Sequence, residues 1–517
     1  MVTAPGHEGS VHHDTVKMLR MSGADIEAPG PASPASRELI GRIFAPALFL
    51  LMLIMPPPDG MTPDAWRVAA MAVLMATLWI TEAVPIPVTA LLPLIVLPLL
   101  GVQEITATAA PYANPVIFLF MGGFMIAIAL ERCGLHRRLA LGIIARSGTG
   151  SAQLVGGFMA ATAFLSMWIS NTAAVLMMLP IATSIIQLCV DRGGDEESER
   201  NFSVALLLGL AYSASIGGLG TLIGTPPNAL LAGFMRETYG VEIGFGQWML
   251  LGVPLVAVSL PLTWIVLTRF LHPLRGDLFR EGREVIAGEL EKLGRISRPE
   301  ATVGFITAAT ATLWIIRPLL EPWIPGLNDT TIAMGGAFAM FVVPLDRKWT
   351  SFGLEWSDIE RLPWSVLLLF GGGLALADSI QKSGLAVWIG DALGAVQGWP
   401  IFAVALIVTV VIVFLTELTS NTATAATFLP VVGAIALAMR IDPLLLALPV
   451  AIGASCAFMM PVATPPNAIV YGSGKISIPQ MARAGLVLNL IFIVLILVVL
   501  FTIGVPLFDL REVVSSQ

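Results

Sequence analysis

"SMWISNTAAVLMMLP" (residues 166–180) and "TELTSNTATAATFLP" (residues 416–430) place the polar triplet Ser-Asn-Thr inside long apolar runs. The triplets are 250 residues apart, and the segments that begin at Val116 and Val366 match at the same offset. "GTPPNALL" (224–231) and "ATPPNAIV" (463–470) form a further pair at an offset of 239, because only the first copy carries the polar loop 191–201. The chain therefore contains an internal duplication.

The composition is that of an integral membrane protein. Of the 517 residues, 56% are hydrophobic and only 12% are charged, with a mean hydropathy of +0.85. Apolar runs long enough to cross a hydrocarbon core of about 30 Å recur throughout, and helices satisfy their own backbone groups in lipid. The alternating segments of a β-barrel are absent from the sequence. We predict an all-α polytopic membrane protein with about 11 transmembrane helices, including a single span over 85–101.

Basic residues predict the orientation of the chain. Arg132, Arg137 and Arg138 follow the opening span of the first repeat, and further basic residues crowd 269–298, whereas the loops 57–64, 102–114 and 319–329 contain no Lys or Arg. The positive-inside rule makes the basic segments cytoplasmic, with the N-terminus inside and the C-terminus outside. The opening helices of the two repeats then run in opposite directions. Such an inverted-topology repeat is typical of secondary transporters, whose sites lie near the membrane midplane.

The polar triplets and the proline pairs predict breaks in helices. Ser, Asn and Thr are preferred N-cap residues, so each triplet indicates the start of a half-helix whose free N–H groups attract an anion. Each Pro-Pro pair breaks a helix, so that Gly224, Thr225, Ala463 and Thr464 present carbonyl oxygens that suit a small cation. The stretches 147–190 and 400–439 each fit either two crossings or one hairpin that turns back inside the membrane.

Two alternatives stay open for the polar residues themselves. The triplets alone fit simple hydrogen bonds between packed helices, worth about 0.6 kcal/mol each, although the matched pairs argue against this interpretation. Glu417 is an acid in a membrane segment, and such acids are candidates for function. It aligns with Met167 of the other repeat, and we consider either a hydrogen-bonded structural acid or a proton or cation relay.

The Ser-Asn-Thr triplets, the Thr-Pro-Pro-Asn pairs and the repeat plan resemble the divalent anion/sodium symporter (DASS) family over residues 40–508. The resemblance implies sodium-coupled symport of di- and tricarboxylates such as succinate, malate, fumarate and citrate. It also implies a homodimer in a cell (inner or plasma) membrane, in which a scaffold holds mobile transport domains with two re-entrant hairpins that move like an elevator. Sodium is the co-transported ion, and neither an organic cofactor nor nucleic acid is expected; membrane lipid surrounds the protein.

The same resemblance implies the site residues. The first sodium site would use Ser166, Ser170, Asn171 and the carbonyl of Gly224, and the second Thr416, Thr419, Asn421 and the carbonyl of Ala463. Substrate carboxylates would meet Asn171, Thr172, Ser420, Asn421 and Thr422, with Thr225 and Thr464 close by. Thr419 stands where a smaller residue is common in the family, but a backbone ligand would survive that change.

We expect six segments along the chain. They are a disordered cytoplasmic tail (1–37), scaffold helices (38–111), the first repeat (112–271), a cytoplasmic amphipathic segment (272–299), the second repeat (300–508) and a C-terminal tail (509–517). Each repeat would contain a scaffold helix, a re-entrant hairpin and a broken helix.

Other functions fit the sequence less well. A sulfate/sodium symporter and a carboxylate exchanger are the nearest alternatives. A membrane-embedded enzyme would need a nucleophile with a base in reach. Histidine is the commonest such base, but the last histidine in the sequence is His272, at the end of a predicted span and before the second repeat. There is no phosphate-binding G-x-x-x-x-G-K-[ST] loop for an ATP-driven pump. A channel would need a ring of carbonyls or charges, which paired broken helices do not provide.

Overall fold

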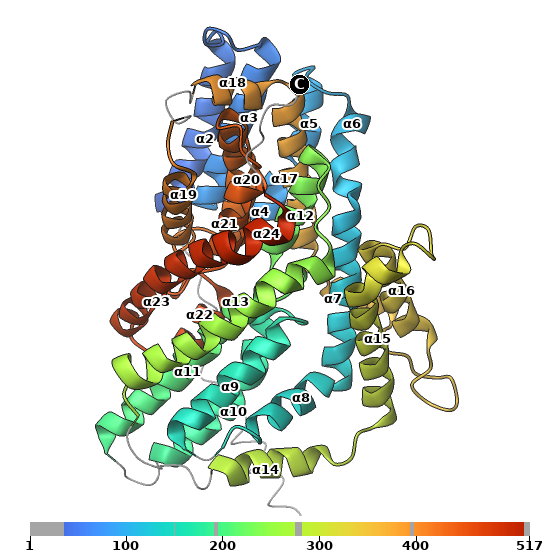
Figure 1. Ribbon diagram of the computed structural model, residues 1–517, viewed down its shortest axis with the longest axis vertical. Helices are drawn as coiled ribbons and strands as arrows, with labels where there is room; N and C mark the ends of the chain where they lie inside the picture. The colour runs from blue at the N-terminus through green and yellow to red at the C-terminus, as the bar shows by residue number, and fades with distance from the viewer. Residues whose placement is uncertain (1–35, 149, 191–194, 275–281, 393–397, 511–517) are drawn as a thin grey trace, which may run out of the picture.

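The computed structural model describes residues 36–148, 150–190, 195–274, 282–392 and 398–510 (Figure 1). Its regular elements are helices, and the described residues contain no β-strand, only isolated bridge residues such as the pair Pro344 and Phe352. Nine helices in the described part of the chain are long and apolar enough to cross a membrane. The predicted all-α membrane fold is confirmed, whereas the predicted number of crossings stays a prediction.

The helices before and within the first repeat are α2 (Ser36–Ile54), α3 (Pro63–Thr81), α4 (Ile86–Thr89), α5 (Leu92–Leu99), α6 (Ile105–Ala109), η1 (Ala110–Ala113), α7 (Pro115–Cys133), α8 (Leu135–Ile144), α9 (Ser151–Ser166), α10 (Asn171–Val190), α11 (Glu196–Gly218), α12 (Pro226–Tyr239), α13 (Phe245–Ile265) and η2 (Val266–Leu271). Then follow α14 (Gly282–Leu293), α15 (Arg298–Leu320), α16 (Asp329–Val342), η3 (Trp356–Arg361), α17 (Trp364–Lys382), α18 (Leu385–Ala392), α19 (Ile401–Leu415), α20 (Asn421–Ala438), α21 (Leu444–Ala454), α22 (Pro465–Gly472), α23 (Ile478–Val499), η5 (Leu500–Gly504) and α24 (Val505–Phe508).

The duplication extends over seven helix pairs, from α7 and α17 to α13 and α23. The bends that follow the first pair are equivalent, since Gly134 (φ 76°) and Gly384 (φ 81°) lie 250 residues apart and both adopt the left-handed conformation that glycine permits. Both α13 and α23 pass into a π-helical turn, η2 and η5. The two copies therefore fold by one plan.

One predicted span is wrong as a continuous helix. Residues 85–101 form α4 and α5 with a break at Ala90 and Leu91. Pro93 has no N–H to donate to the carbonyl of Thr89, four residues earlier, and the carbonyl of Ala90 accepts a hydrogen bond of 2.6 Å from Tyr112 Oη. The backbone of Ala90 also lies so close to Gly372 of α17 that a side chain at position 372 would collide with it. The break thus lets a helix of the second repeat pack against this segment.

The first helix of each polar hairpin is too short to cross a membrane. α9 has 16 residues and α19 has 15, against the ~20 residues that a crossing needs. In Figure 1 the pair α9 and α10 lies in the lower half of the molecule and the pair α19 and α20 in the upper half. These lengths and positions favour two hairpins that enter from opposite ends, as an inverted repeat requires.

The repeats exchange the second halves of their broken helices. α12 packs against α20 and α21 of the second repeat, and α22 packs against α10 and α11 of the first. α21, which the sequence did not single out as a helix, is buried along its whole length between them. This exchange brings the two Thr-Pro-Pro-Asn motifs beside the opposite repeat's helices.

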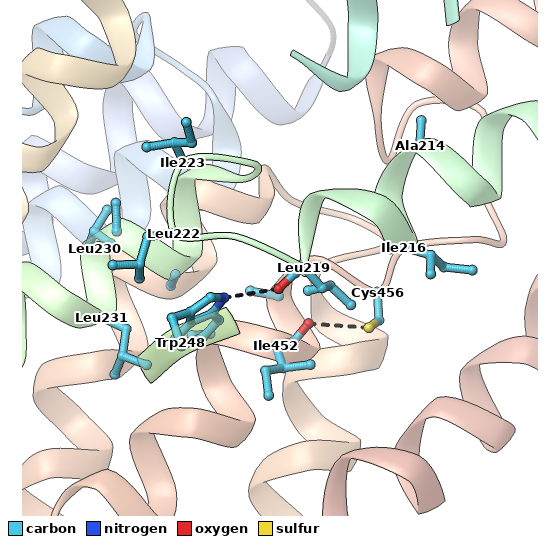
Figure 2. Packing of buried hydrophobic residues seen from close by; sticks show 14 of the residues in the cluster. Ala214, Ile216, Leu219, Leu222, Ile223, Leu230, Leu231, Trp248, Ile452 and Cys456 are labelled. Atoms are coloured by element: carbon cyan, nitrogen blue, oxygen red, sulfur yellow. Dashed lines mark hydrogen bonds between the residues drawn. The ribbon is translucent and has the colours of Figure 1, made fainter. Parts of the chain in front are cut away.

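The core around the first break is tightly packed (Figure 2). Trp248 of α13 is fully buried, and its Nε1 donates a hydrogen bond of 3.0 Å to the carbonyl of Leu219, the residue after α11 ends. Leu222 and Ile452 are drawn close to this contact and belong to the same buried cluster as Trp248. A buried carbonyl outside a helix is thereby satisfied.

The predicted segment boundaries stay predictions. α14 lies within 272–299, with Ile286 buried and Glu289 paired with Arg137 of α8, but its place at a membrane surface is untested. Most of the two predicted tails, 1–37 and 509–517, falls outside the described residues.

Candidate functional site

Oxygen atoms of the first repeat converge at the point where the hairpin meets the broken helix. Ser166 Oγ donates to the carbonyl of Ala214 at 2.7 Å and also contacts Asn171 Oδ1. A Cβ built on Gly218 would lie 3.0 Å from both Asn171 Oδ1 and the carbonyl oxygen of Gly224. We call the oxygens of Ser166, Asn171, Ala214 and Gly224 the first cradle.

The second repeat repeats this arrangement with a threonine in place of the serine. Thr416 Oγ1 lies 2.8 Å from Asn421 Oδ1 and 2.8 Å from the carbonyl of Ala454. Ala463, the counterpart of Gly224, is buried in the non-helical segment that follows. We include the carbonyl of Ala463 by analogy with Gly224, and call the oxygens of Thr416, Asn421, Ala454 and Ala463 the second cradle.

The cradles are short of protons. In each, a single hydroxyl proton lies among three closely spaced oxygens, because the amide Oδ1 and the backbone carbonyl can only accept. Neutral oxygens in such a cluster repel one another unless a cation lies between them, and hard cations prefer oxygen ligands. The donor set fits Na⁺, because no carboxylate is needed to bind one positive charge.

Two helix N-termini lie beside the cradles. α10 begins at Asn171, and Ser170 Oγ accepts from the N–H of Ala173 at 3.1 Å. α20 begins at Asn421 with Ser420 as its N-cap, whose side chain makes no cap hydrogen bond. The predicted starts of both half-helices are therefore correct. Free N–H groups and the helix dipole at these ends favour an anion.

The hydroxyl of Thr419, a predicted ligand of the second sodium ion, is hydrogen-bonded within the hairpin. Its hydroxyl bonds to the carbonyl of Leu415 at 3.0 Å and to Thr424 Oγ1 at 2.6 Å. Only its backbone carbonyl is left to face a cation. The hydroxyl is held within the hairpin instead, because Thr419 and Thr424 are brought together across the turn.

The proline pairs begin new helices after non-helical segments. α11 ends at Gly218 and α12 starts at Pro226, while α21 ends at Ala454 and α22 starts at Pro465. Proline is favoured at the first helical position, where its missing N–H costs nothing. Thr464 Oγ1 caps α22 by accepting from Asn467 N at 3.3 Å.

The asparagine of each motif clamps the segment before it. Asn228 Nδ2 donates to the carbonyls of Gly218 (3.1 Å) and Thr221 (2.8 Å). Asn467 Nδ2 donates in the same way to the carbonyls of Ala457 (3.2 Å) and Met460 (3.0 Å). Both asparagines are fully buried. The matched bonds also identify Ala457 as the structural counterpart of Gly218.

The two repeats meet at these segments. Thr225 Oγ1 lies 3.3 Å from Ser455 Oγ, so a motif threonine of the first repeat contacts the break of the second. Since α22 in turn packs against α10, each hairpin is bordered by the opposite repeat's motif helix or its neighbours. The break of the first repeat therefore touches the break of the second, and whether all predicted residues share one site stays a prediction.

The predicted site residues differ in burial, but not according to their predicted ligand. Ser166, Thr416, Gly224 and Ala463 are buried, and so are Thr225 and Thr464. The triplet side chains are more accessible: Asn171, Thr172, Ser420, Asn421 and Thr422 are half-buried, and Ser170 is exposed. The hydroxyls of Ser166 and Thr416 therefore lie deeper than the triplets.

Sequence reasoning missed several contributors. The carbonyls of Ala214 and Ala454 complete the cradles, Gly218 keeps space open beside the first, and Ser455 links the repeats. The alanine carbonyls could not be predicted, because backbone groups leave no signal in the sequence. The Gly217-Gly218 pair, which ends seven residues before Thr225, was a signal that the sequence did contain.

A separate cavity of ≈ 570 Å³ lies between α8, α9 and α15, among Leu139, Phe164, Trp168 and Phe305. Its walls are almost entirely apolar, so they offer few hydrogen-bond donors for a carboxylate or sulfate. It is not the candidate site.

A sequence model described as "Sodium:sulfate symporter transmembrane region" matches residues 36–510. The chain belongs to the sodium:sulfate symporter family. The resemblance to divalent anion/sodium symporters is thereby confirmed, and the family is one of transporters and not of enzymes.

Individual relatives agree with this family. The chain is 44% identical over 478 residues to a "Sodium-dependent dicarboxylate transporter SdcS" of Staphylococcus saprophyticus, covering 91% of this chain and 92% of the relative. It is 43% identical over 473 residues to the Staphylococcus aureus protein of the same name, covering 90% and 91%.

Solved structures share the fold at low sequence identity. The Alcanivorax borkumensis YdaH transporter aligns with a TM-score of 0.55 and 16% identity over 86% of this chain and 98% of that one. Neisseria gonorrhoeae MtrF aligns with a TM-score of 0.56 and 12% identity over 92% and 97%. Both likenesses concern the fold alone.

Proposed function

We propose that this protein is a secondary active transporter that couples sodium to the symport of di- and tricarboxylates, of the succinate, malate, fumarate and citrate class. The observation that carries the proposal is the pair of proton-poor oxygen cradles, each beside the N-terminus of a membrane-embedded half-helix. The names of the relatives, which are sodium-dependent dicarboxylate transporters, support the same substrate and ion.

Coupling follows from the charges at the site. No charged residue occurs from Ser147 to Val190, so the first hairpin has no Arg or Lys to neutralise a dianion. Two helix N-termini contribute only about half a charge each. Two sodium ions in the cradles supply the remaining positive charge, and the dianion in turn makes the binding of sodium more favourable. Each ligand therefore binds weakly without the other, which is what symport requires.

We assign the groups as follows. Ser166, Ser170, Asn171 and the carbonyl of Gly224 hold one sodium ion; Thr416, the backbone of Thr419, Asn421 and the carbonyl of Ala463 hold the other. Asn171, Thr172, Ser420, Asn421 and Thr422 donate to the carboxylates, and Thr225 and Thr464 line the same chamber. The half-buried state of the triplets leaves their polar groups accessible to a substrate.

We further propose a homodimer with elevator-like transport domains in the cell membrane, with the N-terminus inside and the C-terminus outside. The charges of the loops around α16 support this orientation. Arg347 and Lys348 follow the helix, whereas the loop 319–329 before it contains no basic residue. The exposed apolar residues of α15, including Phe305, Ile315 and Leu319, suit contact with membrane lipid.

The test is uptake of labelled succinate by purified protein in liposomes. An inward sodium gradient should drive accumulation that collapses when the gradient is removed, with citrate competing and sulfate not competing. Uptake that ignores the sodium gradient but responds to internal carboxylate would identify an exchanger. Competition by sulfate alone would identify a sulfate symporter instead.

A further inference from the structure

Glu417 is a buried acid for which the proposed transport chemistry has no use. Its side chain is 3% exposed and lies in the turn of the second hairpin, next to Thr416 of the second cradle. Among the described residues, no ion pair includes it. An uncompensated buried charge is costly unless hydrogen bonds satisfy it.

Hydrogen-bond donors surround the carboxylate. Oε1 accepts from Phe458 N (2.7 Å), Met459 N (2.9 Å) and Asn489 Nδ2 (2.8 Å). Oε2 accepts from Met459 N (3.0 Å) and Met460 N (3.1 Å). Every neighbour donates, so the arrangement suits an ionised carboxylate, which only accepts.

These bonds fix the break of the second repeat. The three N–H groups belong to consecutive residues, 458–460, of the non-helical segment between α21 and α22. The carbonyl of Met460 accepts from Asn467 Nδ2 at 3.0 Å and from Ala463 N at 3.2 Å. Glu417 therefore connects the hairpin, the segment that leads to Ala463 and, through Asn489, helix α23.

In the first repeat, the non-helical segment between α11 and α12 is held without a charged residue. Met167 takes the place of Glu417, and its backbone carbonyl accepts from Thr221 Oγ1 at 2.6 Å. Trp248 holds the carbonyl of Leu219. Among the described residues, the first segment is thus held by neutral donors and the second by the carboxylate of Glu417, the chain neighbour of Thr416 in the second cradle.

We infer that Glu417 is a positioning residue that makes the second cradle the tighter sodium site, so that the two sodium ions bind in order, the second cradle first. A negative charge in a medium of low dielectric constant attracts a nearby cation strongly, and the fixed segment keeps the Ala463 carbonyl in place before the ion arrives. The inference rests on the proposed function, because it presupposes sodium in both cradles.

The experiment compares the sodium dependence of succinate uptake in liposomes for wild type, Glu417→Gln and Met167→Leu, the matched change in the other repeat. Glu417→Gln should raise the sodium concentration for half-maximal uptake about tenfold, with turnover at saturating sodium and succinate within about threefold of wild type. Met167→Leu should leave the half-maximal concentration unchanged. A purely structural role would lower the yield or the turnover without moving sodium dependence.

A second variant keeps the inference testable if Glu417→Gln does not fold. Asn489→Leu retains the charge but removes one donor, and should raise the half-maximal sodium concentration by about threefold. An unchanged sodium dependence in Glu417→Gln, or in Asn489→Leu where the first variant does not fold, would overturn the inference. Absence of sodium-driven uptake in wild type would instead refute the proposed function.

Discussion

Gly218 shows how one missing methyl group shapes an ion site. Its Cα faces the first cradle, and a Cβ there would lie 3.0 Å from Asn171 Oδ1 and Gly224 O and 3.3 Å from Thr225 Cβ. The structural counterpart in the second repeat is Ala457, which carries that methyl group. The two cradles therefore differ in size as well as in charge.

Gly218→Ala should weaken sodium binding while the protein remains folded. The methyl group crowds two oxygens that we assign to the first sodium ion, so the sodium concentration for half-maximal uptake should rise about tenfold or more. On helix propensity alone the change would stabilise the last turn of α11 by up to about 1 kcal/mol. Sodium titration of uptake measures the effect.

The matched change Ala457→Gly should shift sodium dependence by less than about threefold, because it removes a methyl group and adds no contact. If Gly218→Ala transported like wild type at low sodium, the carbonyl of Gly224 would not be an ion ligand.

Asn171→Ala and Asn421→Ala should each abolish sodium-dependent uptake. Each change removes the Oδ1 that lies beside the hydroxyl of its cradle and the amide that we expect to donate to substrate. Each variant loses an ion ligand and a charge-assisted hydrogen bond, so the rate of sodium-dependent uptake should fall by about 100-fold or more.

Size-exclusion chromatography provides the control for these two variants, which should elute like wild type. Sodium-driven uptake at the wild-type rate in either variant would contradict the assignment of the hairpin tips.

The broken helices depend on buried asparagine clamps. Asn228→Ala removes the donor to two buried carbonyls, those of Gly218 and Thr221, and should cost roughly 2–3 kcal/mol of stability. We expect the thermal unfolding midpoint in detergent to fall by several degrees. Thr312→Ala, which removes a hydroxyl bonded only to its own helix, should change stability by less than about 0.5 kcal/mol. Equal midpoints for the two variants would show that the clamp contributes nothing.

The sequence was informative where structure follows from neighbouring residues. Ser420 and Pro465 occupy the cap and first-turn positions that their chemistry favours, so the helix starts could be read directly. The choice between two crossings and a hairpin at each triplet stays a prediction, although the shortness of α9 and α19 favours the hairpin.

Contacts between distant segments could not be predicted in the same way. The cradle carbonyls of Ala214 and Ala454 come from α11 and α21, tens of residues from their hydroxyl partners. Glu417 could have been either a relay or a structural acid until the N–H groups of 458–460 were found around it. The interruption at Ala90 likewise depends on Tyr112 and Gly372, which approach from other helices.

The orientation of the whole molecule decides which side of the membrane each loop faces. Trp323 and Trp349 are 84% and 68% exposed and lie in the loops that precede and follow α16, with Arg347 and Lys348 next to Trp349. On the positive-inside rule Trp323 is outside and Trp349 is cytoplasmic. Single cysteines at these positions report on each side separately.

In a background where Cys133, Cys189 and Cys456 are replaced by serine, Trp323→Cys should react with a membrane-impermeant maleimide in intact cells. Trp349→Cys should react only after permeabilisation, and the cysteine-free parent should not react at all. The reverse labelling pattern would show that the molecule has the opposite orientation in the membrane. The pair of cradles would survive such an inversion, because each repeat supplies one of them. Orientation therefore decides which of the two loops faces the outside, and with it on which side of the membrane each terminus lies.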